Sequence, residues 1–375
     1  MENVSSIQIL SAQEYLMYPL PRTLHCAIAY AWAQGDVEIL IEVFTMEDLR
    51  NPSLRIWKLL KRASEVGATV KILLDKYGCN AGNVEKLPNG KVISHSLSES
   101  SLERYRRSGI EIVYRKATAM SHRKQTIVSI GEKTIAFVGG TNLLAGYETG
   151  FEVNGQHINY TDKQVKLEGQ ICKDLRTSFS KMWQESTKES LPIWESKKST
   201  PALNAVNAVS KTWTHVPTEV LPTSGWRHPM EAEFTIRQLI KSAKKEIIIR
   251  SPYIALSPAL ISALRAAKKR GVKIMFISGM ESDLSQRQEK ILNLSAKICC
   301  KLAKAKLIKN PGYFHHDKLI VIDRETVLVG SMNTDLLSLF WLYELSLCIH
   351  DDRVANQFLE LLSKECPIFR KAHYL

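Results

Sequence analysis

The chain has 375 residues, of which 45% are hydrophobic and 24% charged, with 18 glycines and 13 prolines. This composition excludes disordered, collagen-like and disulfide-scaffold proteins and allows one large domain or two ordinary ones with a substantial core. Lysine and arginine outnumber aspartate and glutamate by 51 to 38, and the formal net charge of +13 suits a polyanionic partner: nucleic acid, an anionic membrane surface or a phosphorylated substrate.

The first half of the chain predicts helices that alternate with short apolar strands. A helical pattern over 26–34 precedes an apolar strand at 37–41, and a second helix ends at Gly67 before a strand at 69–75. Gly67 stands where a helix C-terminus needs a left-handed residue before the chain turns into a strand. This alternation is typical of a largely parallel sheet covered by helices on both faces.

The second half repeats this order of features. It predicts a helix at 234–244, a strand at 246–249, a helix at 258–270 and a strand at 272–277, with Gly271 at the position of Gly67. Residues 185–227, between the two copies, are rich in Ser, Thr, Lys, Pro and Asn and are predicted as a linker. Any large α/β protein alternates in this way, so the alternation alone does not establish a duplication.

The cysteines and the N-terminus bear on cofactors and location. The seven cysteines are scattered without CxxC spacing, and the adjacent Cys299 and Cys300 lack partners at metal-ligand spacing, so we expect reduced thiols, no metal and no cofactor. No cleaved signal peptide is predicted, and no window reaches the roughly 20 apolar residues that span a bilayer. We expect a cytoplasmic or peripheral membrane protein, with secretion by another route left open.

A histidine and a lysine two residues apart open an apolar strand in the second half. Strand alternation puts His316 and Lys318 on one face, so that imidazole and ammonium converge on one point. Downstream, Gly330 lets a neighbouring loop approach closely, and Ser331 and Asn333 add hydrogen-bonding groups. Histidine, lysine, serine and asparagine around an anion predict a phosphate site without metal ligands.

The first half contains the same arrangement. His122 and Lys124 have identical spacing, and a strand and the Gly139-Gly140 turn again lead to an asparagine, Asn142. A single HxKx4D match arises by chance in a few per cent of chains of this length, but a second histidine–lysine pair with the same downstream features does not. The repeat therefore marks two related phosphate-binding segments.

These segments resemble the paired HKD motifs of the phospholipase D superfamily, His-x-Lys-x4-Asp followed by glycine and asparagine. The amino-acid sequence most resembles the cardiolipin synthase branch in residues 122–124, 137–142, 251–253 and 269–272, and again in 162–183. The resemblance runs from about Ile28 to Phe358. It implies two α/β domains, 1–184 and 228–375, each a mostly parallel mixed sheet flanked by helices and related to the other by a pseudo-two-fold axis.

The resemblance also implies a chemistry. One histidine attacks phosphorus to form a phosphohistidine, and the other protonates the departing alcohol and then activates the acceptor. We interpret His122 as the nucleophile and His316 as the acid/base, although the sequence does not decide between them. The groups that would hold the non-bridging oxygens are Lys124, Lys318, Asn142, Asn333 and Ser331.

Each histidine also needs an acidic group behind its other nitrogen. In the family this group comes from a strand downstream of the asparagine, and aligning 344–349 with 162–167 gives Glu344 and Asp162. Asp323 and the glycines Gly139, Gly140 and Gly330 are expected to support the motif structure. Ser129 departs from the pattern, because it stands where the first motif should have its aspartate.

The sequence hypothesis is therefore metal-independent phosphodiester transfer on a glycerophospholipid, with water or an alcohol as acceptor and an anionic membrane surface as partner. Two alternatives stay open: a nuclease of the same superfamily, which the charge of +13 favours equally, and a degenerate module that binds lipid or nucleic acid without turnover. Basic residues such as Lys301 and Lys304 are read as a solvated helix face or a polyanion contact. The apolar run 336–342 is interpreted either as part of the hydrophobic core or as a loop that inserts into lipid. The oligomeric state is left undetermined.

Overall fold

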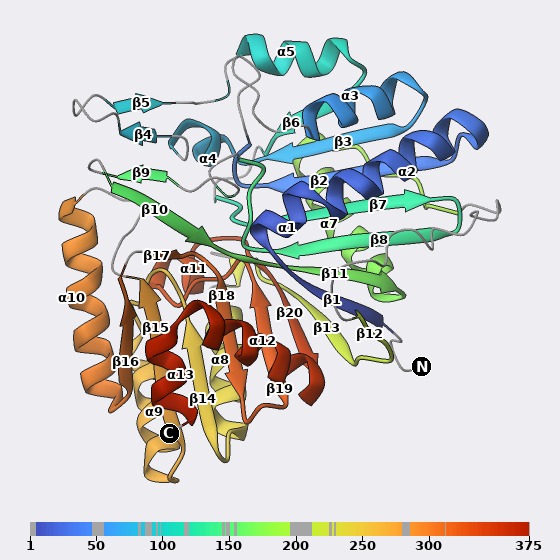
Figure 1. The fold of residues 1–375 in the computed structure, drawn as a ribbon. Helices are drawn as coiled ribbons and strands as arrows, with labels where there is room; N and C mark the ends of the chain where they lie inside the picture. Colours follow the sequence, from blue (N-terminus) through green and yellow to red (C-terminus); the bar gives the residue numbers. More distant parts are fainter. Residues whose placement is uncertain are drawn as a thin grey trace.

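Two mixed β-sheets lie at the centre of the molecule, and helices cover the outer face of each (Figure 1). The computed structural model describes residues 5–46, 56–81, 84–86, 92–94, 97, 99–115, 120–144, 147, 151–153, 156–195, 212–224, 227–228, 230–279, 286–311 and 313–374. Within these ranges, no helix is both long and apolar enough to cross a bilayer.

The first sheet has eight strands. In spatial order they are β12 (Thr212–Trp213), β1 (Ser5–Ser11), β11 (Lys163–Gly169), β8 (Lys133–Gly139), β7 (Gln125–Ile130), β2 (Val37–Val43), β3 (Thr69–Leu74) and β6 (Glu111–Tyr114). Its outer face packs against α1 (Ala12–Met17), α2 (Pro19–Gln34), α3 (Ile56–Glu65) and α5 (Glu99–Arg107). A short helix, α4 (Lys76–Ala81), and a separate hairpin of β4 (Val84–Lys86) and β5 (Val92–Ser94) lie between β3 and α5 in the chain.

The second sheet has seven strands. In spatial order they are β13 (Thr218–Pro222), β20 (Leu345–His350), β19 (Thr326–Gly330), β18 (Lys318–Ile322), β14 (Glu246–Arg250), β15 (Lys273–Gly279) and β16 (Lys306–Asn310). Its outer face packs against α8 (Glu231–Ser242), α9 (Pro258–Lys269) and α10 (Gln286–Ala303). The order from β20 to β16 matches the order from β11 to β6 in the first sheet, so the duplication predicted from the sequence is confirmed.

The predicted elements fall on observed ones. The strands expected at 37–41, 69–75, 246–249 and 272–277 are β2, β3, β14 and β15. Gly67 and Gly271 have φ values of +96° and +92°, the left-handed conformation expected where a helix ends and a strand follows. The prediction of two α/β halves with mixed sheets flanked by helices is confirmed.

One part of the fold prediction is wrong: the sheets are not mostly parallel. Only β2-β3-β6 and β14-β15-β16 pair in parallel, and the other neighbouring pairs in both sheets are antiparallel. The alternation of helix and strand governs these parallel strands, which need helical crossovers. The strands that follow each motif return instead through short hairpins, β7–β8 and β18–β19, which make antiparallel pairs.

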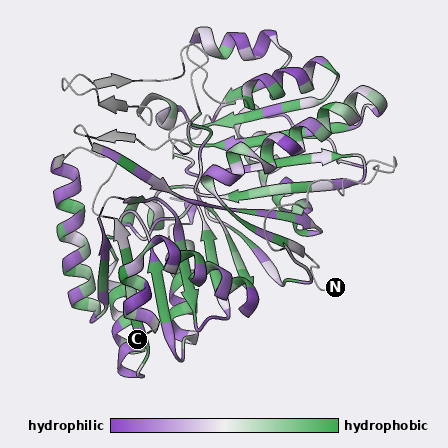
Figure 2. Ribbon diagram, in the orientation of Figure 1, coloured by the Kyte–Doolittle hydropathy of each residue, from purple (hydrophilic) through white to green (hydrophobic). Residues whose placement is uncertain are grey.

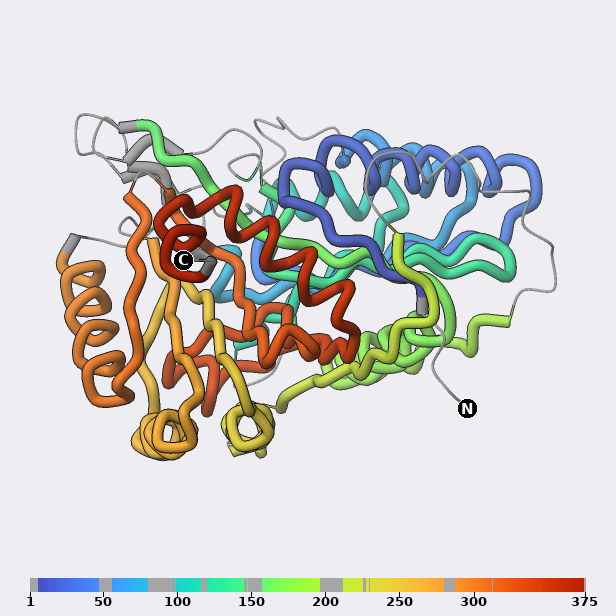
Figure 3. The backbone as a smooth tube through the Cα atoms, turned by 60° about the horizontal axis from the view of Figure 1, so that its bottom comes forward, coloured from blue at the N-terminus to red at the C-terminus, as the bar shows by residue number. Residues whose placement is uncertain are grey.

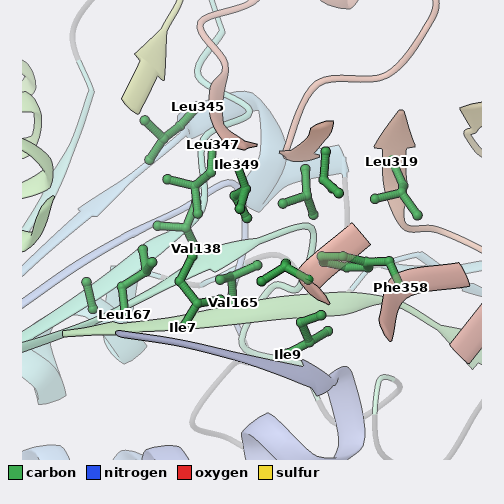
Figure 4. Close-up of a cluster of buried hydrophobic side chains, with 14 of the residues drawn as sticks. Ile7, Ile9, Val138, Val165, Leu167, Leu319, Leu345, Leu347, Ile349 and Phe358 are labelled. Carbon is green, nitrogen blue, oxygen red and sulfur yellow. The ribbon is translucent and has the colours of Figure 1, made fainter. Parts of the chain in front are cut away.

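The inner faces of the two sheets share one hydrophobic core. Figure 4 shows Ile7 and Val138 of the first sheet beside Leu319 and Leu347 of the second, with Phe358 from a helix. The helices that complete this core are α7 (Ile171–Thr187), α12 (Asp352–Glu365) and α13 (Pro367–Tyr374). In Figure 3 the red C-terminal helices lie against the boundary between the two halves. Burial of shared apolar surface therefore holds the halves together.

The segment 185–227, predicted as a linker, contains β12 and β13. β12 adds to an edge of the first sheet and β13 to an edge of the second. Residues 196–211, 225 and 226 of this segment lie outside the described residues. The domain boundaries at 184 and 228 stay predictions.

Asp323 follows the last residue of β18, seven residues after the motif histidine His316. Its carboxylate accepts hydrogen bonds from the backbone N–H groups of Lys244 and Lys245, both at 2.7 Å, and of Glu246 at 2.8 Å. In the first half the hairpin continues further, so that Ser129 lies inside β7 and pairs with Thr134 across the ladder. Ser129 thus lies within a continuing ladder, whereas Asp323 lies at the turn that follows β18.

We therefore expect Asp323→Ala to lower the free energy of unfolding by about 3 kcal/mol, because three backbone donors lose a charged acceptor. Ser129→Ala removes one neutral hydrogen bond and should cost about 1 kcal/mol. Urea unfolding followed by circular dichroism measures both. Equal shifts of the unfolding midpoint in the two variants would contradict this account of the second motif's aspartate.

Candidate active site

The two motif histidines lie at the boundary between the halves, and each is fixed to backbone of the other half. The backbone N–H of His316 donates to the backbone carbonyl of Thr161 at 2.9 Å, and the backbone N–H of His122 donates to that of Tyr343 at 2.8 Å. The first contact continues a parallel pairing of β10 (Gln156–Thr161) with β17 (Tyr313–His315). β10 also pairs with β9 (Phe151–Val153) in the first half.

The acidic partner of each histidine also comes from the opposite half. His316 Nδ1 lies 2.7 Å from Asp162 Oδ2, and His122 Nδ1 lies 3.1 Å from Glu344 Oε1. Each carboxylate comes directly after the residue whose carbonyl holds the histidine backbone. Because Nδ1 of each ring faces a carboxylate, the proton of the neutral ring belongs on Nδ1, which leaves Nε2 unprotonated.

The two motif lysines are buried beside the histidines. Lys124 Nζ donates to the carbonyl of His122 at 2.6 Å, and Lys318 Nζ lies 2.9 Å from His316 Nε2. Lys318 Nζ also donates to the carbonyl of His316. Burial, and then repulsion by Lys318, lowers the pKa of Lys124 to about 7. The site thus concentrates positive charge with little water to screen it.

Both histidines are held in the neutral form. Burial lowers the pKa of His122, with a further lowering by Lys124 that Glu344 opposes. Burial lowers the pKa of His316 well below its usual range, and Lys318 and then Lys124 add to the effect. Burial also raises the pKa of Asp162. A negative charge placed between the lysines would offset the lowering of the two histidine pKa values.

The two asparagines differ in their surroundings. Asn142 Oδ1 accepts from the backbone N–H of Thr45 at 3.3 Å, and its Nδ2 donates to the hydroxyl of Tyr147 at 3.2 Å. Asn333 is 5% exposed, and its Oδ1 has no hydrogen-bond partner among the described residues. Asn333 is therefore the asparagine with unmet hydrogen-bonding capacity at the site.

Ser331 and Gly140 occupy equivalent positions but interact differently with the carboxylates. The Ser331 hydroxyl donates to Glu344 Oε2, whereas a Cβ at Gly140 would lie 2.4 Å from Asp162 Oδ1. Gly139 and Gly330 are equally confined, since a Cβ at either position would approach a backbone carbonyl within 2.1 and 2.3 Å respectively. The glycines predicted to support the motifs thus permit the close approach of β8 to β11 and of β19 to β20.

The residue between the histidine and the lysine of each motif forms an ion pair, and its charge is opposite in the two motifs. Arg123 pairs with Glu42 of β2 at 3.2 Å, and at the equivalent places Asp317 pairs with Arg250 of β14 at 2.9 Å. All four side chains are buried. The second network is larger and joins the two halves. Arg250 contacts Thr161 and Glu365. Lys163 also pairs with Glu365, and His315 contacts Thr161.

Sequence reasoning missed the aromatic residues around the histidines. Tyr147, Tyr160 and Phe314 surround the His316 ring at centroid distances of 5.9, 5.1 and 5.6 Å, and Phe44 meets the His122 ring edge-on at 5.1 Å. Tyr160 lies two residues before Asp162 and Phe314 two residues before His316, on strands that cross the boundary. No periodicity marks them, because their shared contact exists only once the halves pack together.

The apolar run after Asn333 forms a short helix, α11 (Leu336–Phe340), that Asp335 caps. Leu339 is buried in the core of the second half, while Leu336, Leu337 and Trp341 are exposed. Burial raises the pKa of Asp335 to about 6. Within the described part of the chain, no group of three or more His, Cys, Asp or Glu side chains is arranged to hold a metal ion.

Comparison with known proteins identifies the family. A family model described as "Cardiolipin synthase, PLD-like domain" matches residues 31–183 and 236–365. The chain belongs to this family. Both motifs fall inside the matched segments, so the resemblance to the phospholipase D superfamily is confirmed.

Relatives of the cardiolipin synthase family are distant. Cardiolipin synthase A of Pseudomonas putida is 24% identical over 335 residues, which cover 87% of this chain and 63% of the relative. Cardiolipin synthase of Geobacillus thermodenitrificans is 24% identical over 322 residues, which cover 82% of this chain and 61% of the relative. The chain thus spans somewhat less than two thirds of the length of these relatives.

Solved structures share the fold. Phosphatidylserine synthase of Haemophilus influenzae superposes with a TM-score of 0.63 at 13% identity, over 96% of this chain and 85% of that one. Polyphosphate kinase of Porphyromonas gingivalis gives 0.58 at 15% identity, over 95% of this chain and 46% of that one. The architecture of this family member is therefore found in proteins whose names indicate different reactions.

The electrostatics of the site give a test by titration. Lys318→Met removes a positive charge beside His316 and should raise the pKa of that ring, whereas Glu344→Gln removes a negative charge beside His122 and should lower its pKa further. Histidine side-chain NMR over a pH series measures both rings. Lys318→Arg keeps the charge and should leave His316 nearly unshifted. A lower His316 pKa in Lys318→Met would contradict the assigned cause.

Proposed function

We propose that this protein transfers a phosphatidyl group between alcohols, or to water, by a metal-independent reaction through a phosphohistidine. The observation that carries this proposal is the crossed arrangement of two carboxylate-backed histidines with two buried lysines. The family match supports a phospholipid substrate, because the matching relatives are named cardiolipin synthases.

The first half of the reaction forms the covalent intermediate. His122 Nε2 attacks phosphorus, and the N–P bond forms while the P–O bond to the departing alcohol breaks. His316 Nε2–H gives its proton to that oxygen. His316 takes this proton from solvent as the substrate binds, because the anionic phosphodiester between the lysines offsets the burial and the repulsion by Lys318 that lower the pKa of the ring.

The second half resolves the intermediate. The acceptor oxygen gives its proton to His316 Nε2 and attacks phosphorus, and the P–N bond breaks to release His122. An alcohol acceptor such as phosphatidylglycerol yields cardiolipin, and water yields phosphatidic acid. Either route balances without a cofactor.

Four groups supply electrostatic stabilisation. Lys124 and Lys318 neutralise the charge on the non-bridging oxygens, which is the task a metal ion performs in other phosphoryl-transfer sites. We assign Asn333 and Asn142 to the same oxygens, to which their amide Nδ2–H groups, rather than their carbonyl oxygens, can donate. Ser331 donates to Glu344, so we assign its hydroxyl to positioning the carboxylate behind His122 rather than to the phosphate.

The activity test uses vesicles that contain phosphatidylglycerol, with EDTA present and products resolved by mass. We expect turnover by the wild-type protein and a loss of about a thousandfold or more in His122→Ala, His316→Ala and Lys318→Met, the loss typical of acid–base and electrostatic groups. Lys58→Met, at an exposed lysine of the first half, is the matched control for Lys318→Met and should keep the wild-type rate. Loss of turnover on adding EDTA would contradict metal independence. Cleavage of single-stranded DNA, with the lipid left intact, would contradict phosphatidyl transfer and support the nuclease hypothesis.

The roles of the two histidines are separable with a substrate whose leaving group is nitrophenolate, which departs without a proton. His316→Ala should then release a stoichiometric burst of nitrophenolate and retain the phosphatidyl group on His122, which mass spectrometry of the peptide detects. His122→Ala should give no burst. The reverse pattern would exchange the two roles.

A further inference from the structure

Helix α10 exposes a continuous row of large apolar side chains. Ile291, Leu294, Ile298 and Leu302 are 59, 58, 49 and 48% exposed. Their spacing of three, four and four residues places them on one face of the helix, within about 80° of one another at 100° per residue. Figure 1 shows α10 at the outer edge of the second half.

This apolar row is not the face that packs on the sheet. The core contacts of α10 come from small side chains on another face: Ala296, Cys299, Cys300 and Ala303, all buried. The hydropathy colouring of Figure 2 shows apolar segments alternating with hydrophilic ones along the exposed length of the helix. The fold therefore needs only the small residues, and stability does not account for the large ones.

A row of lysines runs alongside the apolar row. Lys290, Lys297 and Lys301 are exposed, and their spacing of seven and four residues places them on one flank of the apolar face. Arg287 is exposed near the N-terminal end. Glu289 is the one acidic residue of the helix, and helical geometry places it on the side opposite the apolar row.

We propose that the exposed face of α10 is a docking surface for an anionic phospholipid bilayer. The apolar row would enter the interface between headgroups and acyl chains, and the lysine row would contact lipid phosphates. This inference rests on the proposed function, since a phosphatidyl transferase must reach lipid in a membrane. The helix is followed by β16 and β17, and β17 ends directly before His316, so the surface is close along the chain to the site.

Charge complementarity favours a bilayer over a second copy of the chain. An antiparallel pair of these helices about a two-fold axis would bring the two lysine rows to the same side of the contact, where they repel. A membrane that contains phosphatidylglycerol offers negative charge along the whole lysine row and an apolar interior beside it.

The test measures binding without turnover. Wild-type protein should sediment with vesicles of phosphatidylcholine mixed with phosphatidylglycerol, and much less with phosphatidylcholine alone. Lys290→Gln, Lys297→Gln and Lys301→Gln together should weaken binding about a hundredfold, from about fivefold for each lysine. Leu294→Ser with Ile298→Ser should weaken it about tenfold or more.

Matched controls separate this surface from general charge and hydrophobicity. Lys58, Lys173 and Lys181 are exposed on the first half, and their triple replacement by glutamine changes the net charge equally. Ile193 and Ile368 are exposed away from α10, and Ile193→Ser with Ile368→Ser matches the apolar change. Both control variants should bind like the wild type. Equal losses in the control and α10 variants would overturn the proposal.

Two further readouts keep the outcomes distinct. A short-chain phosphatidylglycerol below its critical micelle concentration needs no membrane, so the α10 variants should turn it over like the wild type, which also shows that they fold. Wild-type binding by the α10 variants, or a dimer in light scattering that Leu294→Ser disperses, would overturn the bilayer surface and leave the proposed reaction intact. Vesicle binding that depends on α10, without turnover of any lipid, would overturn the reaction alone.

Discussion

The constraint on which the site depends is the exchange of contacts across the boundary between the halves. His122 is held through its backbone by Tyr343 and through its ring by Glu344, and the symmetry-related contacts of His316 are made by the first half. Neither half by itself can orient its own histidine. The shared core between the sheets therefore has a functional consequence, because the apolar surface buried there keeps each carboxylate at its imidazole (Figure 4).

This exchange allows the protein to bury a concentration of like charge. Two lysines lie beside two neutral imidazoles and two carboxylates, and the cost of burying these groups appears as lowered pKa values for Lys124, His122 and His316. Burial of charged groups costs free energy, so the surrounding structure must fix them. This arrangement suits the proposed reaction, because an anionic phosphodiester brings negative charge to the two lysines.

The duplication is close in topology but not in detail. Gly140 faces Asp162 where Ser331 faces Glu344, and the charges of the underlying pairs are reversed between Arg123 and Asp317. Aromatic rings crowd His316 more than His122. These differences give the two histidines different environments, as the proposed division into one nucleophile and one acid/base requires. The apolar and lysine rows of α10 add a further difference outside the site.

The sequence by itself determined the features that are local in the chain. The repeated histidine–lysine spacing, the strands that follow it and the glycines at Gly67 and Gly271 all follow from periodicity and backbone preference over a few residues. The tertiary structure decided which carboxylate backs which histidine, where the Ser331 hydroxyl points and how many strands run antiparallel. These depend on contacts such as that between His122 and Glu344, which are 222 residues apart, and no local pattern encodes such a contact. Ser129 shows the same limit, because only the strand pairing reveals that this residue lies inside β7 while Asp323 lies at the turn after β18.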